Sequence, residues 1–160
     1  MNCNTILTFI LPNVYYQLIV RAGGDIIKNQ ATISKREVKL FIDELKRVLT
    51  SDVFNADTDF FINIKDKPGN DHYYSNLYTL QDLEYDTHDV IGILSSLTVA
   101  DYSETVFDKD DSNPILLHVF GREINSRLIY IKLKLRESDR KYIVCVSFHY
   151  AKNKMVFPYR

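Results

Sequence analysis

The sequence predicts an α+β fold, in which an antiparallel sheet of at least three strands packs on helices. Two observations support this prediction. Apolar residues recur at helical spacing in residues 34–50 and about 87–97, whereas they alternate with polar residues in residues 127–135. A chain of 160 residues, 46% of them hydrophobic, is long enough to form one compact core.

The first predicted helix covers residues 34–50. Ser34 and Glu37 form an S-x-x-E capping box, in which each side chain satisfies a backbone N–H of the first turn. The apolar residues that follow lie at helical spacing: Val38, Phe41, Ile42, Leu45, Val48 and Leu49. Thr79 and Thr87 are the expected N-caps of two shorter helices, of which the second covers about residues 87–97. We expect the helices to cover one face of a sheet.

The three predicted strands cover about residues 115–120, 127–135 and 141–149. We expect the first strand to end at Gly121 and polar residues 137–140 to form a turn between the other two. In residues 127–135, one face carries Ile129, Ile131, Leu133 and Leu135, and the other carries Leu128, Tyr130, Lys132 and Lys134. In residues 141–149, the two faces carry Tyr142, Val144, Val146 and Phe148, and Ile143, Cys145, Ser147 and His149. The pattern predicts a meander with one face against helices and one face open.

The remaining segments carry weaker signals. Residues 60–64 are compatible with a short strand, and residues 103–114 are expected to form a polar loop. Residues 5–20 are apolar but too short for a membrane span, so they could be packed strands, packed helices or part of a poorly ordered extension. We therefore divide the chain into an N-terminal extension of uncertain order, residues 1–32, and a single α+β domain, residues 33–160.

Cysteine content and charge indicate the redox compartment of the protein and the kind of partner it binds. Cys3 and Cys145 are too few for a disulfide framework, which favours a reducing compartment, most simply the cytoplasm. The net charge of −1 conceals an asymmetry, because residues 1–50 carry +3, residues 51–120 carry −11 and residues 121–160 carry +7. The basic end favours contact with a polyanion. Alternatively, the acidic middle neutralises the basic end within the fold, and both hold if an acidic loop shields a basic site.

The last two strands bring together a candidate site. If their turn is centred near Ser138 and Asp139, antiparallel pairing places Tyr130 opposite Ser147 and Leu128 opposite His149. Tyr130, Lys132, Ser147 and His149 then share a patch of the open face. The arrangement depends on register, because a slip of one residue moves a whole set of side chains to the other face.

These residue types suit RNA cleavage without a metal, in which the ribose 2′-OH is the nucleophile. We expect three catalytic residues: His149 exchanges a proton near neutral pH, Lys132 stabilises charge on the phosphate, and Tyr130 donates a hydrogen bond or assists proton transfer. The candidate RNA-binding residues are Lys134, Arg122, Arg127 and Ser147. His149, Tyr130 and the two lysines also have ordinary alternatives, since strand-end histidines and exposed lysines are commonly solvated and tyrosine favours strands.

Signals for a metal or a cofactor are absent from the sequence. The four histidines form no short ligand pair, and no Cys/His cluster occurs. There is also no P-loop, no G-x-G-x-x-G motif and no nucleophile elbow. We therefore expect neither a metal nor a cofactor.

Five short segments follow one another in the second half of the chain: LTVADY at 97–102, VFGREI at 119–124, YIKLKL at 130–135, VCVSFH at 144–149 and the C-terminal PYR. In order and spacing they resemble the motility quorum-sensing regulator (MqsR) family of type II toxins. The resemblance covers roughly residues 33–160 and is strongest from residue 97 onward. It implies a RelE-like fold, cleavage of mRNA and inhibition by a cognate antitoxin protein, with the ribosome as a further candidate partner and no membrane.

The resemblance also assigns roles to individual positions. The catalytic tyrosine of the family falls on Tyr130, and the lysine that follows V-S-F in the family falls on His149. Two other positions differ, because a family lysine corresponds to Glu104 and a family glutamine to about Leu117. Lys132, Lys134 or Arg122 could substitute, or the activity could be weaker.

Three functions are therefore open at this stage. The first is an endoribonuclease toxin. The second is a non-catalytic module that binds RNA or a partner protein on the same basic sheet, which Glu104 and Leu117 favour. The third, a small-molecule enzyme that uses the acidic middle of the chain, has no motif in its support.

Overall fold

The structure, a computed structural model, describes residues 5–11, 14–20, 26–108 and 116–160. Its strands are β1 (Thr5–Leu11), β2 (Val14–Val20), β3 (Ile26–Ile33), β4 (Phe60–Ile62), β5 (Tyr102–Phe107), β6 (Leu116–Ile124), β7 (Arg127–Glu137) and β8 (Lys141–Tyr150). Its helices are α1 (Lys35–Leu49), α2 (Ala56–Asp59), α3 (Asn76–Leu83) and α4 (Thr87–Ser95), with 3-10 helices η1 (Gly69–Tyr74) and η2 (Val99–Asp101).

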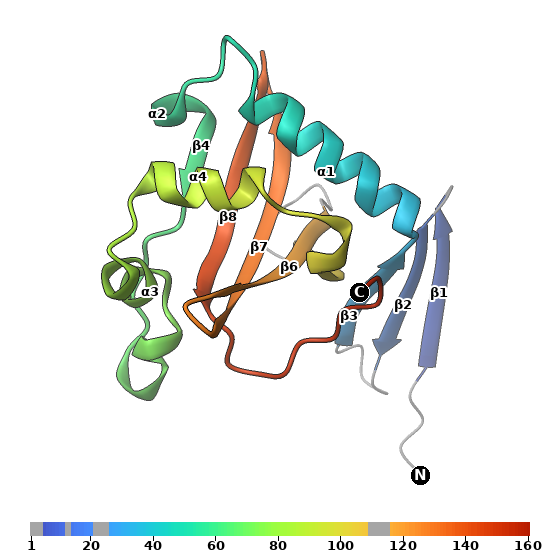
Figure 1. Ribbon diagram of the computed structural model, residues 1–160. Coiled ribbons are helices and arrows are strands. Elements are labelled where there is room, and N and C mark those ends of the chain that lie inside the picture. Colours follow the sequence, from blue (N-terminus) through green and yellow to red (C-terminus); the bar gives the residue numbers. More distant parts are fainter. Residues whose placement is uncertain (1–4, 12–13, 21–25, 109–115) are drawn as a thin grey trace.

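The strands form one sheet in the order β1-β2-β3-β5-β6-β7-β8-β4. Neighbouring strands are antiparallel except β4 and β8, which are parallel. Helices α1 and α4 cross one side of the sheet (Figure 1), and the core lies between them and the strands. The predicted α+β class, with a mainly antiparallel sheet packed on helices, is therefore confirmed.

Helix α1 begins at the predicted capping box. The Glu37 backbone N–H donates to Ser34 Oγ at 3.2 Å, and the Ser34 N–H donates to Glu37 Oε2 at 2.7 Å. The apolar stripe of the helix is buried as expected, through Val38, Ile42, Leu45 and Val48.

The N-caps of the two shorter helices lie four residues and one residue before the predicted ones. Ser75 caps α3 and accepts from the N–H of Tyr78 at 3.1 Å, whereas Thr79 lies inside the helix. Asp86 caps α4, so Thr87 is its first helical residue. The prediction for Thr79 was wrong because its hydroxyl has a tertiary partner, the backbone N–H of Tyr150 at 3.1 Å.

The prediction that the strand from residue 115 ends at Gly121 was also wrong. Strand β6 continues to Ile124, and the chain reverses at Asn125 and Ser126, whose φ angles of 50° and 59° are left-handed. A two-residue turn of this handedness matches the twist of a β-hairpin. Gly121 is needed for close packing against the C-terminal residues, as described below, and not for a chain reversal.

Residues predicted as a loop contain an additional strand. The short strand expected over residues 60–64 is present as β4, but Ser103–Phe107, expected in a polar loop, belongs to β5. A register shift between Tyr102 and Glu104 breaks the two-residue period that would have marked the strand. Residues 109–114 of the expected loop and residue 115 of the expected strand lie outside the described residues.

The first three strands extend the sheet beyond the predicted domain. Strands β1, β2 and β3 form an antiparallel meander, and β3 pairs with β5 at Gln30–Val106 and Ala31–Thr105. The division of the chain at residue 33 stays a prediction. In the described part of the chain, no helix has the length and apolarity needed to cross a membrane.

Candidate active site

A β-bulge in β8 determines which side chains reach the open side of the sheet. Lys132 pairs with Ser147, whereas the next residue of β7, Leu133, pairs with Cys145. The extra residue between these pairs shifts the alternation, so Cys145 is in the core before the bulge and Phe148 after it. The predicted faces of residues 141–149 were therefore wrong, because Ile143 and Cys145 do not share a face with His149.

Helix α3 holds this bulge through one buried amide. The Asn76 side chain, 5% exposed, donates through Nδ2 to the carbonyl oxygens of Val146 (3.2 Å) and Asn63. Its Oδ1 accepts from the backbone N–H of Phe148 at 2.9 Å. Asn76 thus satisfies backbone groups of β8 at the point where pairing with β4 ends.

The bulge places Tyr130 directly opposite His149, and Lys132 opposite Ser147. In the predicted register Tyr130 pairs with Ser147, two residues before its true partner. One residue of the difference arises because the turn is centred on Asp139 and not between Ser138 and Asp139, and the other because the bulge adds one residue to β8. A shift of two keeps Ser147 and His149 on the face of Tyr130, although the bulge moves Ile143 and Cys145 to the opposite face. The structure therefore brings together the same four residues as the sequence predicted, and the rings of Tyr130 and His149 stack with centroids 5.3 Å apart.

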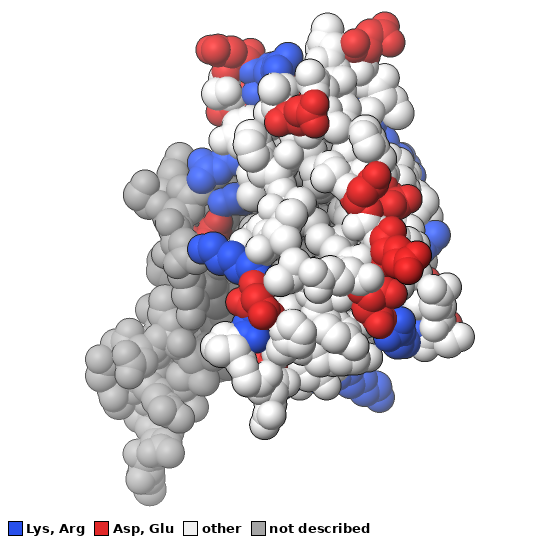
Figure 2. Space-filling view, turned by 90° about the vertical axis from the view of Figure 1, so that its left-hand side faces the viewer, with Lys and Arg blue, Asp and Glu red and all other residues white. Residues whose placement is uncertain are grey.

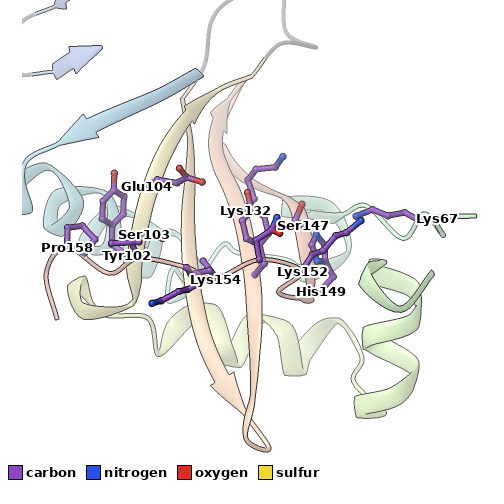
Figure 3. Close-up of a pocket in the computed structure, with 14 residues that line it drawn as sticks. Lys67, Tyr102, Ser103, Glu104, Lys132, Ser147, His149, Lys152, Lys154 and Pro158 are labelled. Atoms are coloured by element: carbon purple, nitrogen blue, oxygen red, sulfur yellow. The ribbon is translucent and has the colours of Figure 1, made fainter. Parts of the chain in front are cut away.

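These four residues line a cavity of about 810 Å³ on the open side of the sheet. Its walls come from β5, β7, β8, the loop that contains Lys67 and the C-terminal tail, residues 151–160 (Figure 3). The lining residues are Lys67, Tyr102, Ser103, Glu104, Tyr130, Lys132, Ser147, His149, Lys152, Asn153, Lys154, Met155, Val156 and Pro158.

The C-terminal tail lies against the sheet at Gly121. A Cβ atom on Gly121 would lie 2.6 Å from the Phe157 ring and 3.0 Å from Met155 Sδ, so only glycine allows this approach. The tail is also held further on, where the hydroxyl of Tyr159 donates to the Ile33 carbonyl at 2.5 Å and its ring stacks on Tyr102. These contacts fix the backbone that carries Lys152 and Lys154.

The hydrogen bond of His149 defines its tautomer. Its Nδ1 lies 2.9 Å from the carbonyl oxygen of Tyr150, which can only accept, so Nδ1 carries the proton and Nε2 is the basic nitrogen. Burial lowers the pKa of His149, and the positive charges of Lys67 and Lys132 lower it further, against the opposing effect of the Tyr150 carbonyl. The imidazole is therefore neutral at neutral pH.

Tyr130 is held in its protonated form. Burial raises the pKa of its phenol to about 12, and the negative charge of Glu104 acts in the same direction. The stacked pair thus consists of a neutral base and a neutral acid.

Of the predicted RNA-binding residues, the cavity contains only Ser147. Arg122 pairs with Asp101 at 2.9 Å. Arg127 pairs with Asp82 at 2.7 Å and lies over the Tyr150 ring at 4.2 Å. Lys134 is buried and pairs with Asp108. The structure therefore places these three side chains outside the cavity.

At least five of the ten Lys and Arg residues of the basic end pair with acids of the middle segment. Ion pairs between the two join Arg122 to Asp101, Arg127 to Asp82, Lys134 to Asp108, Arg140 to Asp59 and Lys152 to Asp71. Figure 2 shows one face of the molecule on which basic and acidic side chains are interspersed. The alternative interpretation of the charge asymmetry thus holds for at least five cations. Three cations of the same basic end line the cavity, namely Lys132, Lys152 and Lys154, and of these Lys152 also has an acidic partner.

Three cationic residues of the cavity were missed in the sequence: Lys67, Lys152 and Lys154. Lys152 and Lys154 alternate in the tail, and the basic count of residues 121–160 was the one signal that included them. Lys67 comes from the acidic middle, far from the strands in sequence, and no local pattern marks it. Glu104 also lines the cavity, at the position where the resemblance leads to a lysine.

Within the described residues, no group of three or more His, Cys, Asp or Glu side chains could hold a metal ion. Cys145 is fully buried, and burial raises the pKa of its thiol to about 12. Comparisons with protein-family models, with curated proteins and with solved structures each find no match to this chain.

Proposed function

We propose that the protein is a toxin of a type II toxin–antitoxin system that cleaves mRNA as a metal-independent endoribonuclease, similar to the MqsR family. The observation that carries the proposal is the stacked pair of His149 and Tyr130 in a cavity that also contains Lys132. A neutral imidazole and a protonated phenol are the two proton carriers that attack by a ribose 2′-OH requires.

In the proposed step, Nε2 of His149 takes the proton of the 2′-OH while the 2′-oxygen forms a bond to phosphorus. The ammonium of Lys132 stabilises the charge on the pentavalent phosphate, where fixed charges contribute most to catalysis. The bond from phosphorus to the 5′-oxygen breaks, and the phenol of Tyr130 gives its proton to that oxygen. The products are a 2′,3′-cyclic phosphate and a 5′-hydroxyl, and solvent restores the two side chains.

The other lysines of the cavity extend the positive surface beyond the reacting phosphate. Lys67 donates to the Tyr74 carbonyl at 2.9 Å, and Lys152 pairs with Asp71, so both are held by neighbouring groups. We assign Lys67, Lys152 and Lys154 to the phosphates on either side of the cleaved one. This role replaces the one expected for Lys134, Arg122 and Arg127, which do not line the cavity.

A second candidate function is a non-catalytic RNA-binding module. The observation in its favour is Glu104, which adds a negative charge to a cavity that would hold phosphates. Such a module would retard RNA in a gel with steep salt dependence and leave it uncut.

The proposed partners follow from the resemblance. A cognate antitoxin protein would bind the toxin, and the ribosome is a further candidate partner. A gene for a small protein immediately beside this one supports the assignment, and a solitary gene counts against it.

The proposal is tested by expression of wild type and His149→Ala in bacterial cells. Wild type should arrest growth, whereas His149→Ala should be harmless, because loss of a general base typically lowers the rate about 10²–10⁴-fold. The matched control is His88→Ala, which changes an exposed histidine of α4 and should remain toxic. Equal toxicity of wild type and His149→Ala, at equal protein levels, removes His149 from catalysis.

A further inference from the structure

Four tyrosines form a cluster where η1, α3 and β8 meet. Tyr73 and Tyr74 belong to η1, Tyr78 to α3 and Tyr150 to the end of β8. The Tyr73 ring contacts the other three, with centroids 5.0–5.1 Å apart. Tyr73 is 38% exposed, and Tyr74 and Tyr78 are half-buried. This tyrosine cluster therefore presents a contiguous patch of aromatic surface, and such patches commonly mark binding sites.

The tyrosine cluster is continuous with the cavity. Figure 3 shows Lys67, Lys152 and His149 together at one end of the cavity. The ammonium of Lys152 lies 5.7 Å from the centroid of the Tyr74 ring, and Lys67 donates to the Tyr74 carbonyl at 2.9 Å. A chain that leaves the cavity at this end therefore meets Tyr74 first and then Tyr73.

The cluster is held in place by the segments around it. Within the loop and η1, Nδ1 of His72 lies 2.6 Å from Oδ1 of Asp66. On the other side, the Arg127 guanidinium lies 4.2 Å from the centroid of the Tyr150 ring. An aromatic surface that is fixed before binding loses little conformational entropy when a ligand docks.

The chemistry of the cluster fits an unstacked base better than a phosphate. The two cations that lie over its rings are paired with acids, Lys152 with Asp71 and Arg127 with Asp82. Tyrosine rings offer flat faces on which any RNA base can stack, as in many proteins that bind single strands. Phosphates therefore suit the lysines of the cavity, and bases suit the tyrosines beside it.

The sheet indicates which side of the RNA reaches the cluster. Strand β8 lies between β7 and β4, so His149 is farther from β6 than its partner Tyr130 is. Tyr73 stacks on Tyr150, the residue that follows His149, so the cluster lies on the same side. In the proposed reaction His149 takes the proton of the 2′-OH, which belongs to the nucleotide 5′ to the cleaved phosphate. The upstream nucleotides would therefore extend toward the cluster.

We propose that the tyrosine cluster is a stacking surface for the bases of single-stranded RNA on the 5′ side of the cleaved phosphate, with Tyr73 as its main contact. The inference rests on the proposed endoribonuclease function and adds a binding surface outside the cavity. The cavity holds the reacting phosphate, and the cluster orders the strand that leads into it.

The first test measures binding without cleavage. An RNA of about ten nucleotides with 2′-O-methyl ribose throughout lacks the attacking hydroxyl, and its affinity for the purified protein is measured by fluorescence anisotropy. Tyr73→Leu should weaken binding about tenfold, because leucine fills the site but offers no ring for stacking. Tyr73→Phe keeps the ring and should bind like wild type. The matched control is Tyr142→Leu, which changes a tyrosine whose ring contacts Phe61, away from the cavity, and should also bind like wild type.

The second test uses wild type and locates the contact on the RNA. Once the cleavage site in an unmodified RNA is mapped, single bases are removed on either side of it, and kcat/KM is compared. Removal of a base on the 5′ side should lower kcat/KM about tenfold in wild type and have little further effect in Tyr73→Leu. Removal on the 3′ side should lower kcat/KM equally in both proteins. A dependence on Tyr73 confined to the 3′ side would overturn the inference.

The two tests separate this inference from the proposed function. RNA that wild type binds in a Tyr73-dependent way but leaves uncut removes the nuclease assignment and leaves the stacking surface. RNA that wild type and Tyr73→Leu bind and cut equally well removes the stacking surface and leaves the nuclease. If, in addition, the protein encoded by a neighbouring gene binds wild type more tightly than Tyr73→Leu, the cluster is a protein contact and the inference is overturned.

Discussion

At the scale of single residues, one physical effect prepares both proton carriers of the proposed reaction. Removal from water disfavours the charged form of any side chain, so it favours neutral imidazole in His149 and neutral phenol in Tyr130. A base must be unprotonated and an acid protonated before the reaction begins. Burial of the stacked pair therefore provides both states at neutral pH without a metal.

The pH dependence of cleavage tests this account. His149 acts as a base only above its pKa, which lies below the ordinary value of 6.5, and Tyr130 acts as an acid only below a pKa of about 12. The kcat/KM should therefore rise through an apparent pKa below 6.5 and stay level through neutral and mildly alkaline pH. A rate that falls between about pH 5 and pH 7 would show that protonated histidine is needed, and would reverse its role.

Residue types and local alternation predicted the four central residues, but neither the register that pairs Tyr130 with His149 nor the surroundings of the four. Tyr130, Lys132, Ser147 and His149 come from two adjacent strands, so their meeting depends on a short-range pairing that the sequence encodes. Lys67 and Glu104 approach the same cavity from other elements. Their positions depend on the tertiary path of the chain, on which the local pattern carries no information.

At the scale of elements, the bulge in β8 places His149 on the open side of the sheet, although Ile143 and Cys145 of the same strand face the core. Without the extra residue, the alternation that buries Ile143 and Cys145 would also bury His149. The sequence alone does not reveal such a bulge, because residues 144–149 contain no turn or breaker residue that would mark it. The residue that stabilises the bulge is Asn76, about seventy positions away in the sequence. Its amide forms hydrogen bonds with backbone groups of Val146 and Phe148.

Replacement of Asn76 should lower both the stability of the protein and its activity, because Asn76 holds the bulge of β8. Asn76→Ala leaves the Val146 carbonyl and the Phe148 N–H without this partner, and each buried unsatisfied group costs about 1–3 kcal/mol. We expect a lower free energy of unfolding and, well below the melting temperature, a larger loss of kcat than of substrate affinity. Denaturant unfolding and steady-state kinetics measure the two effects. Asn70→Ala, which changes an exposed residue of η1, is the control, and equal behaviour of the two variants would refute the positioning role.

The tail provides a second test at this scale. In Gly121→Ala the new methyl group would lie 2.6 Å from the Phe157 ring, so the tail must move and shift Lys152 and Lys154. We expect KM for RNA to rise severalfold while kcat changes little, because the hairpin with His149 and Tyr130 is retained. Phe157→Leu in the same chain should restore KM, since it removes the contacting ring atoms.

The control for the tail experiment is Gly92→Ala in α4. No atom lies within 4 Å of its added Cβ, and alanine favours a helix over glycine by roughly 1 kcal/mol. This variant should be as active as wild type and equally or more stable. An unchanged KM in Gly121→Ala would show that the position of the tail does not matter for RNA.

At the scale of the whole molecule, the charge asymmetry serves both the fold and the cavity. Acids of the middle segment pair with cations of the basic end, both outside the cavity, as Asp101 does with Arg122, and at its edge, as Asp71 does with Lys152. The lysines of the cavity come from three separate parts of the chain. The segment charges indicated a basic surface, but only the fold shows which of its cations line the cavity.

The fold as a whole was predicted where order is local and missed where it depends on pairing between distant segments. Helix α1 and the β7–β8 hairpin carry their own periodicity and caps. Strand β5 does not, because a register shift near Glu104 interrupts its alternation. The three strands before residue 33 likewise became evident only through their place in the sheet.

The most direct test of the central claim is analysis of the ends that the purified protein leaves on RNA in the presence of EDTA. If neutral His149 activates the 2′-OH and Tyr130 protonates the 5′-oxygen, the fragments should carry 2′,3′-cyclic phosphates and 5′-hydroxyls, and chelation should not change the rate. Fragments with 3′-hydroxyls and 5′-phosphates, or loss of cleavage on chelation, would contradict the account.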